Sequence, residues 1–281
     1  MTAPRPEIAA LVREAFHRLI ADEAFALAGN IAFRIVFSVF PFLIFLTTLA
    51  GFFGNEQLAE RIVGFLLGVA PAEIVRPLVP EIRSILTVPR TGLLSISAIL
   101  TIWSAMGGID SVRVGLNRAY DTKEDRTVFR LYGQGIVFVI GSAVLLLVIA
   151  LLIVLAPLLF AFIDAHFPSL KPSFVKFDPL RYPIAIILLI GGVLLCHLFL
   201  PARRGAMSEV VPGVLLTVAV WLGLSAAFSY YLVRFNTFAS TYASLSGFFA
   251  AMFFVYLAAV VLILGGEVNR VIALRRHAPG G

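Results

Sequence analysis

Long apolar runs separated by short polar segments dominate the chain. Each run covers the roughly 20 residues that a helix needs to cross the hydrocarbon core of a bilayer. The runs predict six membrane-spanning helices, at residues 24–53, 91–109, 131–163, 182–200, 211–233 and 245–266. The predicted fold class is therefore all-α, a polytopic membrane helical bundle that forms one integral membrane domain over residues 1–281. The pattern leaves five or seven spans open as alternatives.

Shorter amphipathic segments lie outside these runs. Residues 1–23 place Leu11, Ala15 and Leu19 on one helical face, which predicts a helix on the cytoplasmic membrane surface. Residues 54–90 contain two apolar stripes separated by Pro71, which predict two short amphipathic helices on the extracytoplasmic side. These helices either lie flat on the membrane or cover the bundle as a lid. Residues 267–281 are predicted to form a cytoplasmic tail.

The composition supports a membrane protein and excludes a soluble fold. Apolar residues make up 60% of the chain and charged residues 14%, compared with about 45–50% and about 25% in soluble domains. A net charge of +6 would favour a nucleic-acid partner in a soluble protein. Here the basic residues flank apolar spans, where anionic lipid headgroups attract them, so no nucleic-acid partner is predicted.

The basic residues also orient the spans. Flanks on the side of both termini carry thirteen lysines and arginines, and the opposite flanks carry eight. The positive-inside rule therefore predicts a multi-pass membrane protein with both termini in the cytoplasm.

Signals for enzyme chemistry are weak. The four histidines have no spacing that would place two on one metal ion, and the single cysteine, Cys196, excludes an intrachain disulfide. Nucleotide-binding glycine motifs and a nucleophile elbow are absent from the sequence. The sequence thus predicts no catalytic residues, no metal and no cofactor, and indicates a protein that is not an enzyme.

The most unusual polar residue is Arg34, which lies about ten residues inside the first apolar run. Burying its guanidinium in lipid costs several kcal/mol unless it finds a partner or reaches the interface. Asn30, Arg34 and Ser38 recur every four residues and share one helix face, near Pro41. This face either lines a cavity or contacts a partner helix. The alternative is that Arg34 snorkels to the cytoplasmic headgroups.

Few acidic residues are available to pair with Arg34. Asp110 ends the second span and Glu267 ends the sixth, both on the predicted cytoplasmic side. The predicted substrate-binding set is Arg34, Asn30, Ser38, Asp110 and Glu267, with Arg34 paired to either acid.

A second ladder of polar and small residues follows one face of the fifth span. It consists of Gly213, Thr217, Trp221, Ser225 and Ser229. Such residues typically mediate close helix–helix contact in lipid, and lining a transport path is the alternative.

Three sequence blocks carry a resemblance to a known family. They are ALAGNIAFRIVFSVFPFLIFL (26–46), TIWSAMGGIDSVRVGLNRAYDTKEDR (101–126), and the closing region over 200–235 and 241–269 with its Leu-Gly-x-Glu-x-Asn element. In these blocks the chain resembles the YihY/BrkB family of bacterial inner-membrane proteins, in matching order over nearly its whole length. Arg34 stands where the family typically has an aromatic residue, and Ala243-Ser244 stands where Tyr-Gly-Ser is usual. Arg34 is thus a feature of this branch, rather than a general site of the family.

The resemblance implies six helices with cytoplasmic termini and a role in the bacterial envelope. Family members have been labelled ribonuclease BN, but the acidic residues of DTKEDR (121–126) are predicted to form only a solvated charged turn, which argues against nuclease activity. We expect a transporter or lipid-handling protein for an anionic amphiphile such as phospholipid, with membrane lipids as partners. The alternatives are a non-transporting scaffold that docks an envelope protein and, third, a small-solute or ion channel.

Overall fold

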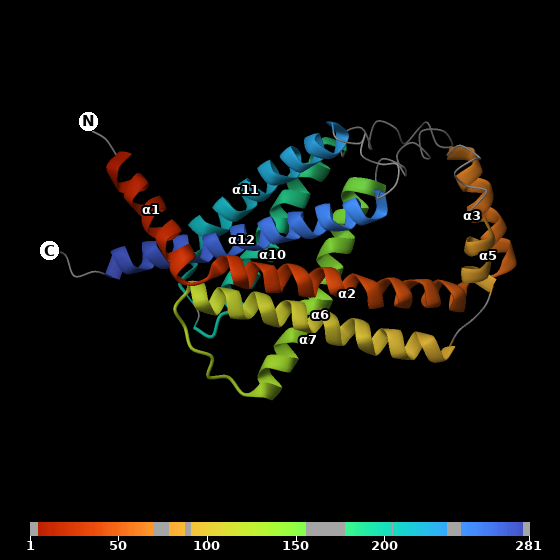
Figure 1. Cartoon of the computed structure of the whole chain (residues 1–281), viewed down its shortest axis with the longest axis horizontal. Coiled ribbons are helices and arrows are strands. Elements are labelled where there is room, and N and C mark those ends of the chain that lie inside the picture. The colour runs from red at the N-terminus through yellow and green to blue at the C-terminus, as the bar shows by residue number, and fades with distance from the viewer. Residues whose placement is uncertain are drawn as a thin grey trace. The chain divides into compact units, whose positions relative to one another are not determined.

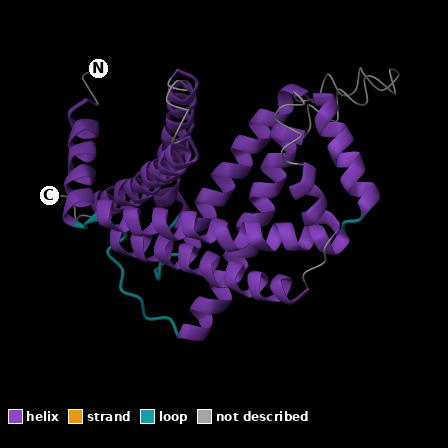
Figure 2. Cartoon of the chain, turned by 45° about the vertical axis from the view of Figure 1, so that its right-hand side comes forward, coloured by secondary structure: helices purple, strands orange, loops and turns teal. Residues whose placement is uncertain are grey.

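The computed structural model describes residues 5–69, 79–87, 91–155, 178–203, 205–234 and 243–277. Every regular element in these ranges is helical (Figure 2). Helices long and apolar enough to cross a membrane are α2 (Ala24–Phe53), α6 (Thr91–Ala119), α7 (Val128–Ala150), α10 (Arg181–Phe199), α11 (Met207–Arg234) and α12 (Ala243–His277). The all-α fold class is therefore confirmed, and the described residues contain the six helices that were predicted to span the membrane.

The helix ends differ from the predicted span ends mainly where a helix leaves the apolar run. Helix α6 continues past residue 109 to Ala119, and α12 continues past residue 266 to His277. Both extensions still bury one apolar side, with Leu116 on α6 and Val271 on α12 shielded from solvent. One-sided burial is enough to keep a helix regular after the sequence ceases to look like a membrane span. The third predicted span is described only to residue 155, where α7 is followed by a π-helical turn, Leu151–Leu155.

The predicted amphipathic segments form α1 (Arg5–Ala21), α3 (Glu56–Val69) and α5 (Val79–Thr87). Residues 70–78, which include Pro71 and much of the second stripe, lie outside the described residues. Helix α1 presents two apolar stripes. Ala15 and Leu19 are buried, whereas Val12, Phe16 and Ile20 are exposed. One stripe of α1 therefore packs on protein, and the other is free to contact the membrane surface.

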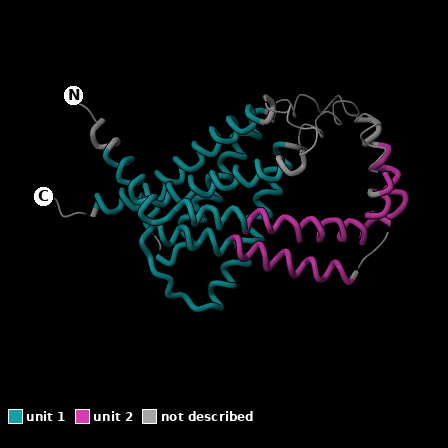
Figure 3. Tube along the Cα trace, viewed as in Figure 1, with its two compact units in different colours: residues 1–33, 109–281 teal, residues 34–108 magenta. Residues whose placement is uncertain are grey.

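The chain divides into two compact units, which Figure 3 distinguishes by colour. Unit 1 comprises residues 1–33 and 109–281. Within it α11 packs along α12, α10 packs on α11, and α1 packs on α12. A small apolar core of Ala15, Val268 and Val271 joins α1 to α12, and Arg275 Nη2 lies 2.8 Å from Glu14 Oε2. The first and last described helices thus lie together, as Figure 1 also shows.

Unit 2 comprises residues 34–108. Its parts of α2 and α6 run side by side, and the hydroxyls of Thr48 and Ser97 lie 3.4 Å apart between them. Helices α3 and α5 pack against each other, with Arg83 Nη2 2.5 Å from Glu60 Oε1.

Pro212 lies deeper in α11 than the sequence predicts. We expected it in the first turn of a helix beginning near residue 211, but α11 begins at Met207, so that expectation is wrong. Proline has no N–H to donate to the carbonyl four residues earlier, which is that of Ser208. The Ser208 carbonyl instead accepts a hydrogen bond from Arg276 Nη1 at 3.2 Å. A side chain from α12 therefore replaces the missing backbone bond.

Candidate functional site

Arg34 lies on α2 with an exposed side chain, in unit 2. Its guanidinium lies over Gly107 of α6, because a Cβ built on Gly107 would come within 2.9 Å of Arg34 Nη1. Any larger residue at position 107 would displace the guanidinium. The hydroxyl of Ser38, one turn further along α2, donates to the backbone carbonyl of Ile35 at 2.7 Å. Its proton is therefore used within the helix, while its oxygen can still accept a hydrogen bond.

The other three predicted site residues belong to unit 1. Asn30 Oδ1 accepts a hydrogen bond from the Ser111 hydroxyl at 3.2 Å. Asp110 pairs with Arg113, one turn along α6, and Glu267 Oε2 pairs with Arg18 Nε at 3.0 Å. The Glu267 side chain is fully buried, and Arg18 on α1 supplies the charge that compensates it. The structure thus gives Asp110 and Glu267 arginine partners that the sequence did not suggest, and the pairing of either acid with Arg34 stays a prediction.

Helices α11 and α12 approach each other closely at a pair of glycines. A Cβ on Gly213 would overlap the Gly265 carbonyl, and one on Gly265 would overlap the Thr217 hydroxyl. Further along the contact, Trp221 Nε1 donates to the Ala258 carbonyl at 2.9 Å. The packing role predicted for this face of the fifth span is confirmed for Gly213, Thr217 and Trp221.

The close approach of α11 and α12 supports a buried polar chain centred on Asn269. Asn269 Oδ1 accepts a hydrogen bond from the Gly213 N–H at 2.7 Å, and its Nδ2 donates to the Tyr120 hydroxyl at 2.9 Å. The Tyr120 hydroxyl in turn lies 2.8 Å from Nδ1 of His197, whose side chain is also buried. Since Asn269 supplies a donor to the Tyr120 oxygen, the tyrosine proton is left to point at His197. Burial raises the pKa of the Tyr120 hydroxyl well above its ordinary value, so it remains protonated.

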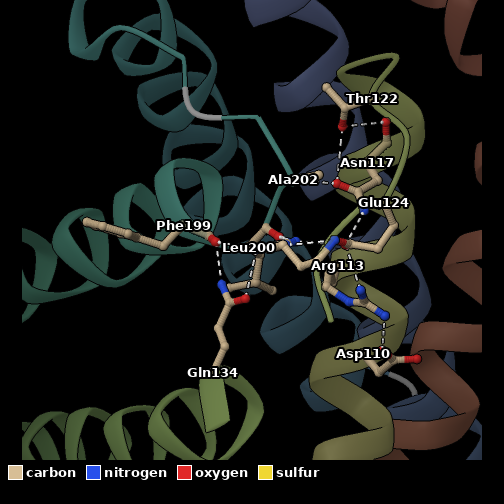
Figure 4. A network of polar contacts seen from close by, with 10 residues as sticks. Asp110, Arg113, Asn117, Thr122, Glu124, Gln134, Phe199, Leu200 and Ala202 are labelled. Atoms are coloured by element: carbon tan, nitrogen blue, oxygen red, sulfur yellow. Dashed lines mark hydrogen bonds and ion pairs between the residues drawn. The ribbon is translucent and has the colours of Figure 1, made fainter. Parts of the chain in front are cut away.

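A second polar network surrounds Glu124, in the loop between α6 and α7 (Figure 4). Glu124 Oε2 accepts hydrogen bonds from Arg113 at 2.6 Å, Arg126 at 2.7 Å and Asn117 at 3.0 Å. Arg126 Nη2 also donates a hydrogen bond to the Leu200 carbonyl at 2.7 Å, and Asn117 Oδ1 accepts a hydrogen bond from the Ala202 N–H at 2.7 Å. The network therefore ties the α6–α7 loop to the loop between α10 and α11.

The hydrogen bonds from Arg126 are the main reason that the pKa of Glu124 is lowered to about 2, and Asn117 adds to the effect. Glu124 and Arg126 are structural ties between loops, so the expectation of a merely solvated charged turn at residues 121–126 is wrong for these two residues. The sequence carries no signal for this tie, because Leu200 and Ala202 lie 74 and 85 positions from the residues that bond them.

The backbone at the end of α6 is fixed by a Schellman motif. Asp121 has φ 52°, in the left-handed region, the Thr122 N–H bonds the Asn117 carbonyl at 2.9 Å, and the Asp121 N–H bonds the Arg118 carbonyl at 3.0 Å. Glycine usually occupies this position. The motif turns the chain sharply, so that the α6–α7 loop passes beside the ends of α11 and α12.

A cavity of about 530 Å³ lies beside this turn. Its walls come from the α6–α7 loop, the α10–α11 loop, the first turn of α11 and one face of α12. Tyr120 and Asn269 of the buried polar chain line it, together with charged side chains from each wall. The sequence-predicted site did not include this cavity, because its residues come from three segments, within 120–125, 202–210 and 269–273, that only the fold brings together.

Comparison with known proteins adds a family match and one similar relative. Residues 15–280 match a family model described as virulence factor BrkB. The chain is 26% identical over 269 residues to a protein of Bacillus subtilis (strain 168) named as ribonuclease-like protein YfkH, covering 95% of this chain and 97% of the relative. No solved structure matches the chain.

Proposed function

The chain belongs to the BrkB family of membrane proteins, and from this premise we propose that it binds and moves an anionic amphiphile such as a phospholipid. Arg34 receives the anionic headgroup, Asn30 and Ser38 contribute hydrogen bonds, and the acyl chains remain in the bilayer. The proposal includes location in the bacterial inner membrane, which the family resemblance implies, with both termini in the cytoplasm, which the charge bias favours.

The observation that carries this proposal is the setting of Arg34. It is an exposed arginine in the strongly apolar helix α2, and the neighbouring Phe37 and Phe40 on the same helix are 50% and 53% exposed. A guanidinium in such surroundings is costly unless protein groups, interfacial water or a bound anion compensate its charge, and an anion does so most fully. A phosphate diester compensates it well, because two guanidinium N–H groups can bond two phosphate oxygens at once.

Gly107 lies directly beneath the Arg34 guanidinium. The absence of a side chain on α6 leaves space for the guanidinium against the helix surface. The guanidinium is thus supported from one side, which reduces the entropy that it loses when it binds a headgroup.

Nuclease chemistry has less support in this chain. The ribonuclease-like name belongs to the Bacillus relative. Of the acidic residues in the α6–α7 loop, Glu124 is bound by two arginines, and Asp121 lies 3.5 Å from Arg270 Nη2. Carboxylates engaged in this way act as structural partners, and this supports a binding or transport protein over a hydrolase.

The first test is lipid retention by the purified protein, measured by native mass spectrometry after extraction from a mixed phosphatidylethanolamine and phosphatidylglycerol membrane. We expect wild type to retain phosphatidylglycerol and Arg34→Gln to retain about tenfold less, the effect of one lost charge-assisted interaction. The matched control is Arg61→Gln, which removes an exposed arginine on α3 of the same unit.

Equal phosphatidylglycerol retention by wild type and a folded Arg34→Gln protein would contradict the proposal. It would move the assignment to the scaffold alternative. Movement is measured separately, as the rate at which labelled phosphatidylglycerol crosses liposomes that contain the protein. This rate should fall in Arg34→Gln and not in Arg61→Gln.

A further inference from the structure

The cavity beside the end of α6 has the dimensions of a small-molecule site. Its volume of about 530 Å³ falls within the roughly 300–1,000 Å³ of ligand pockets in proteins. Its walls come from several segments of unit 1, so a ligand bound there would contact loops and helices together. The residues of this cavity are separate from Arg34, Asn30 and Ser38.

Three basic side chains line the cavity from three different segments. Lys123 belongs to the α6–α7 loop, Arg203 to the α10–α11 loop and Arg270 to α12. The Nε of Arg270 is shielded from solvent and has no hydrogen-bond partner among the described residues. Convergence of cations from separate segments is costly through mutual repulsion, and an anion bound between them would offset that cost.

The acidic residues of the cavity are partly engaged with the protein itself. Asp121 lies 3.5 Å from Arg270 Nη2, and Glu209 Oε2 lies 3.4 Å from the Ala206 N–H at the start of α11. Asp125 is left as a carboxylate that can accept a hydrogen bond from a ligand hydroxyl or amino group. The cavity thus holds three cations and three carboxylates, and Lys123 and Arg203 are the two cations that form no ion pair among the described residues.

Helix α11 adds to the same charge. It begins at Met207, and the two residues before it, Gly205 and Ala206, line the cavity next to Arg203 along the chain. The N-terminal end of a helix carries a partial positive charge and free N–H groups. Arg203 and the N–H groups at the start of α11 thus lie in one wall of the cavity, where Glu209 of the first turn supplies a carboxylate.

We propose that this cavity binds a small phosphate ester, with the phosphate between Arg203 and Lys123 and the polar remainder of the ligand towards Tyr120 and Asp125. The phosphate ester is either a soluble metabolite or the headgroup of a lipid, since both present the same chemistry. The site requires no action by Arg34 and stands independently of the proposed transport.

Binding is tested with the full chain in phosphatidylcholine nanodiscs, by titration calorimetry with inorganic phosphate and with glycerol 3-phosphate. A second arm measures retention of phosphatidic acid by native mass spectrometry. The variants are Arg203→Gln and Lys123→Gln. The matched control is Arg130→Gln, which removes an exposed arginine of α7 that does not line the cavity.

We expect each cavity variant to weaken binding by about tenfold, the loss of one charge-assisted contact, with Arg130→Gln and Arg34→Gln unchanged. Arg203→Lys, which keeps the charge, should restore part of the affinity and shows that the loss is not misfolding. Binding in the calorimetric arm identifies a soluble ligand, and binding only in the lipid arm identifies a headgroup. Absence of binding in both arms, or binding that ignores Arg203 and Lys123, would overturn the proposal. The Arg34→Gln lipid assay is unaffected by either result.

Discussion

Glu124 shows how one partly exposed side chain can hold two loops in place. Its carboxylate accepts hydrogen bonds from Arg113, Arg126 and Asn117, and two of these partners contact the α10–α11 loop. Removing the carboxylate would leave Arg126 without its anion and Arg113 with Asp110 alone. The energetic effect is moderated by water, since Glu124 is at the surface.

We predict that Glu124→Gln lowers the free energy of unfolding at pH 7 by about 1–2 kcal/mol, after allowance for screening. The pKa of Glu124 in the folded protein is about 2, below its ordinary value of 4.5. The carboxylate therefore stabilises the fold above pH 4.5, and this stabilisation is lost as the pH falls from 4.5 towards 2. The difference between wild type and variant should accordingly shrink in acid.

The measurement is chemical unfolding in detergent from pH 7 down to pH 3. Asp125→Asn is the matched control, since it removes the neighbouring charge from a residue with no ion pair among the described residues. A Glu124→Gln difference that stays constant across this range would show that the network is not held by the charge of Glu124.

Single residues were predictable from the sequence only when their own position was unusual. Arg34 stood out because a charge inside an apolar run is costly wherever its partners lie. Glu267 was identified, but its partner Arg18 was not, because the two are 249 positions apart. The cavity cations Lys123 and Arg203 look like ordinary flanking charges in the sequence, and only the fold brings them together.

At the scale of helices, the closest glycine-mediated contact in unit 1 is the one between α11 and α12. Backbone meets backbone at Gly213 and Gly265, and the Gly213 N–H bonds Asn269 across the interface. In lipid, where apolar helices gain little by burying apolar surface, such close contact is a main source of association.

We predict that Gly213→Ala destabilises the protein by about 1–3 kcal/mol, because the new methyl group forces the two backbones apart. The matched control is Gly223→Ala on the same helix, where a Cβ meets nothing within 4 Å. That change should be neutral or stabilise the protein by up to about 1 kcal/mol, since alanine favours helix more than glycine does. Thermal unfolding in detergent measures both, and equal effects of the two changes would contradict the close-packing interpretation.

The sequence predicted the helices better than their ends. Ala24–Phe53 was predicted with its observed bounds, because the apolar run and the helix coincide there. The extensions of α6 and α12 were missed, since hydropathy detects the part of a helix that lipid surrounds and not the part that protein stabilises. The α11 ladder was read correctly because small residues every fourth position have one common use in membranes.

At the scale of the whole molecule, the proposed orientation places the C-terminal end of α12, the cavity and the α6–α7 loop on the cytoplasmic side, and α3 on the opposite side. The positive-inside bias supports this arrangement. It can be tested without knowledge of the ligand.

We predict that Lys123→Cys and Arg61→Cys, each in a Cys196→Ala background, react differently with a membrane-impermeant maleimide. In intact spheroplasts the reagent should label Arg61→Cys on α3 and leave Lys123→Cys unlabelled until the membrane is lysed. Labelling of Lys123→Cys in intact spheroplasts would show that the orientation is the opposite one, and that the cavity opens to the other side of the membrane.

The contact between α1 and α12 has a consequence for how the protein is made. Glu267 leaves the ribosome 249 residues after Arg18. At about 5–20 residues per second this interval is roughly 10–50 s. During that time Arg18 lacks Glu267, and the apolar stripe of α1 that includes Ala15 lacks the α12 surface on which it packs. The bundle of unit 1 is therefore completed only after α12 is inserted. A chain interrupted before α12 leaves uncovered the surfaces of α1 and α11 that α12 packs against, and membrane quality control can recognise them.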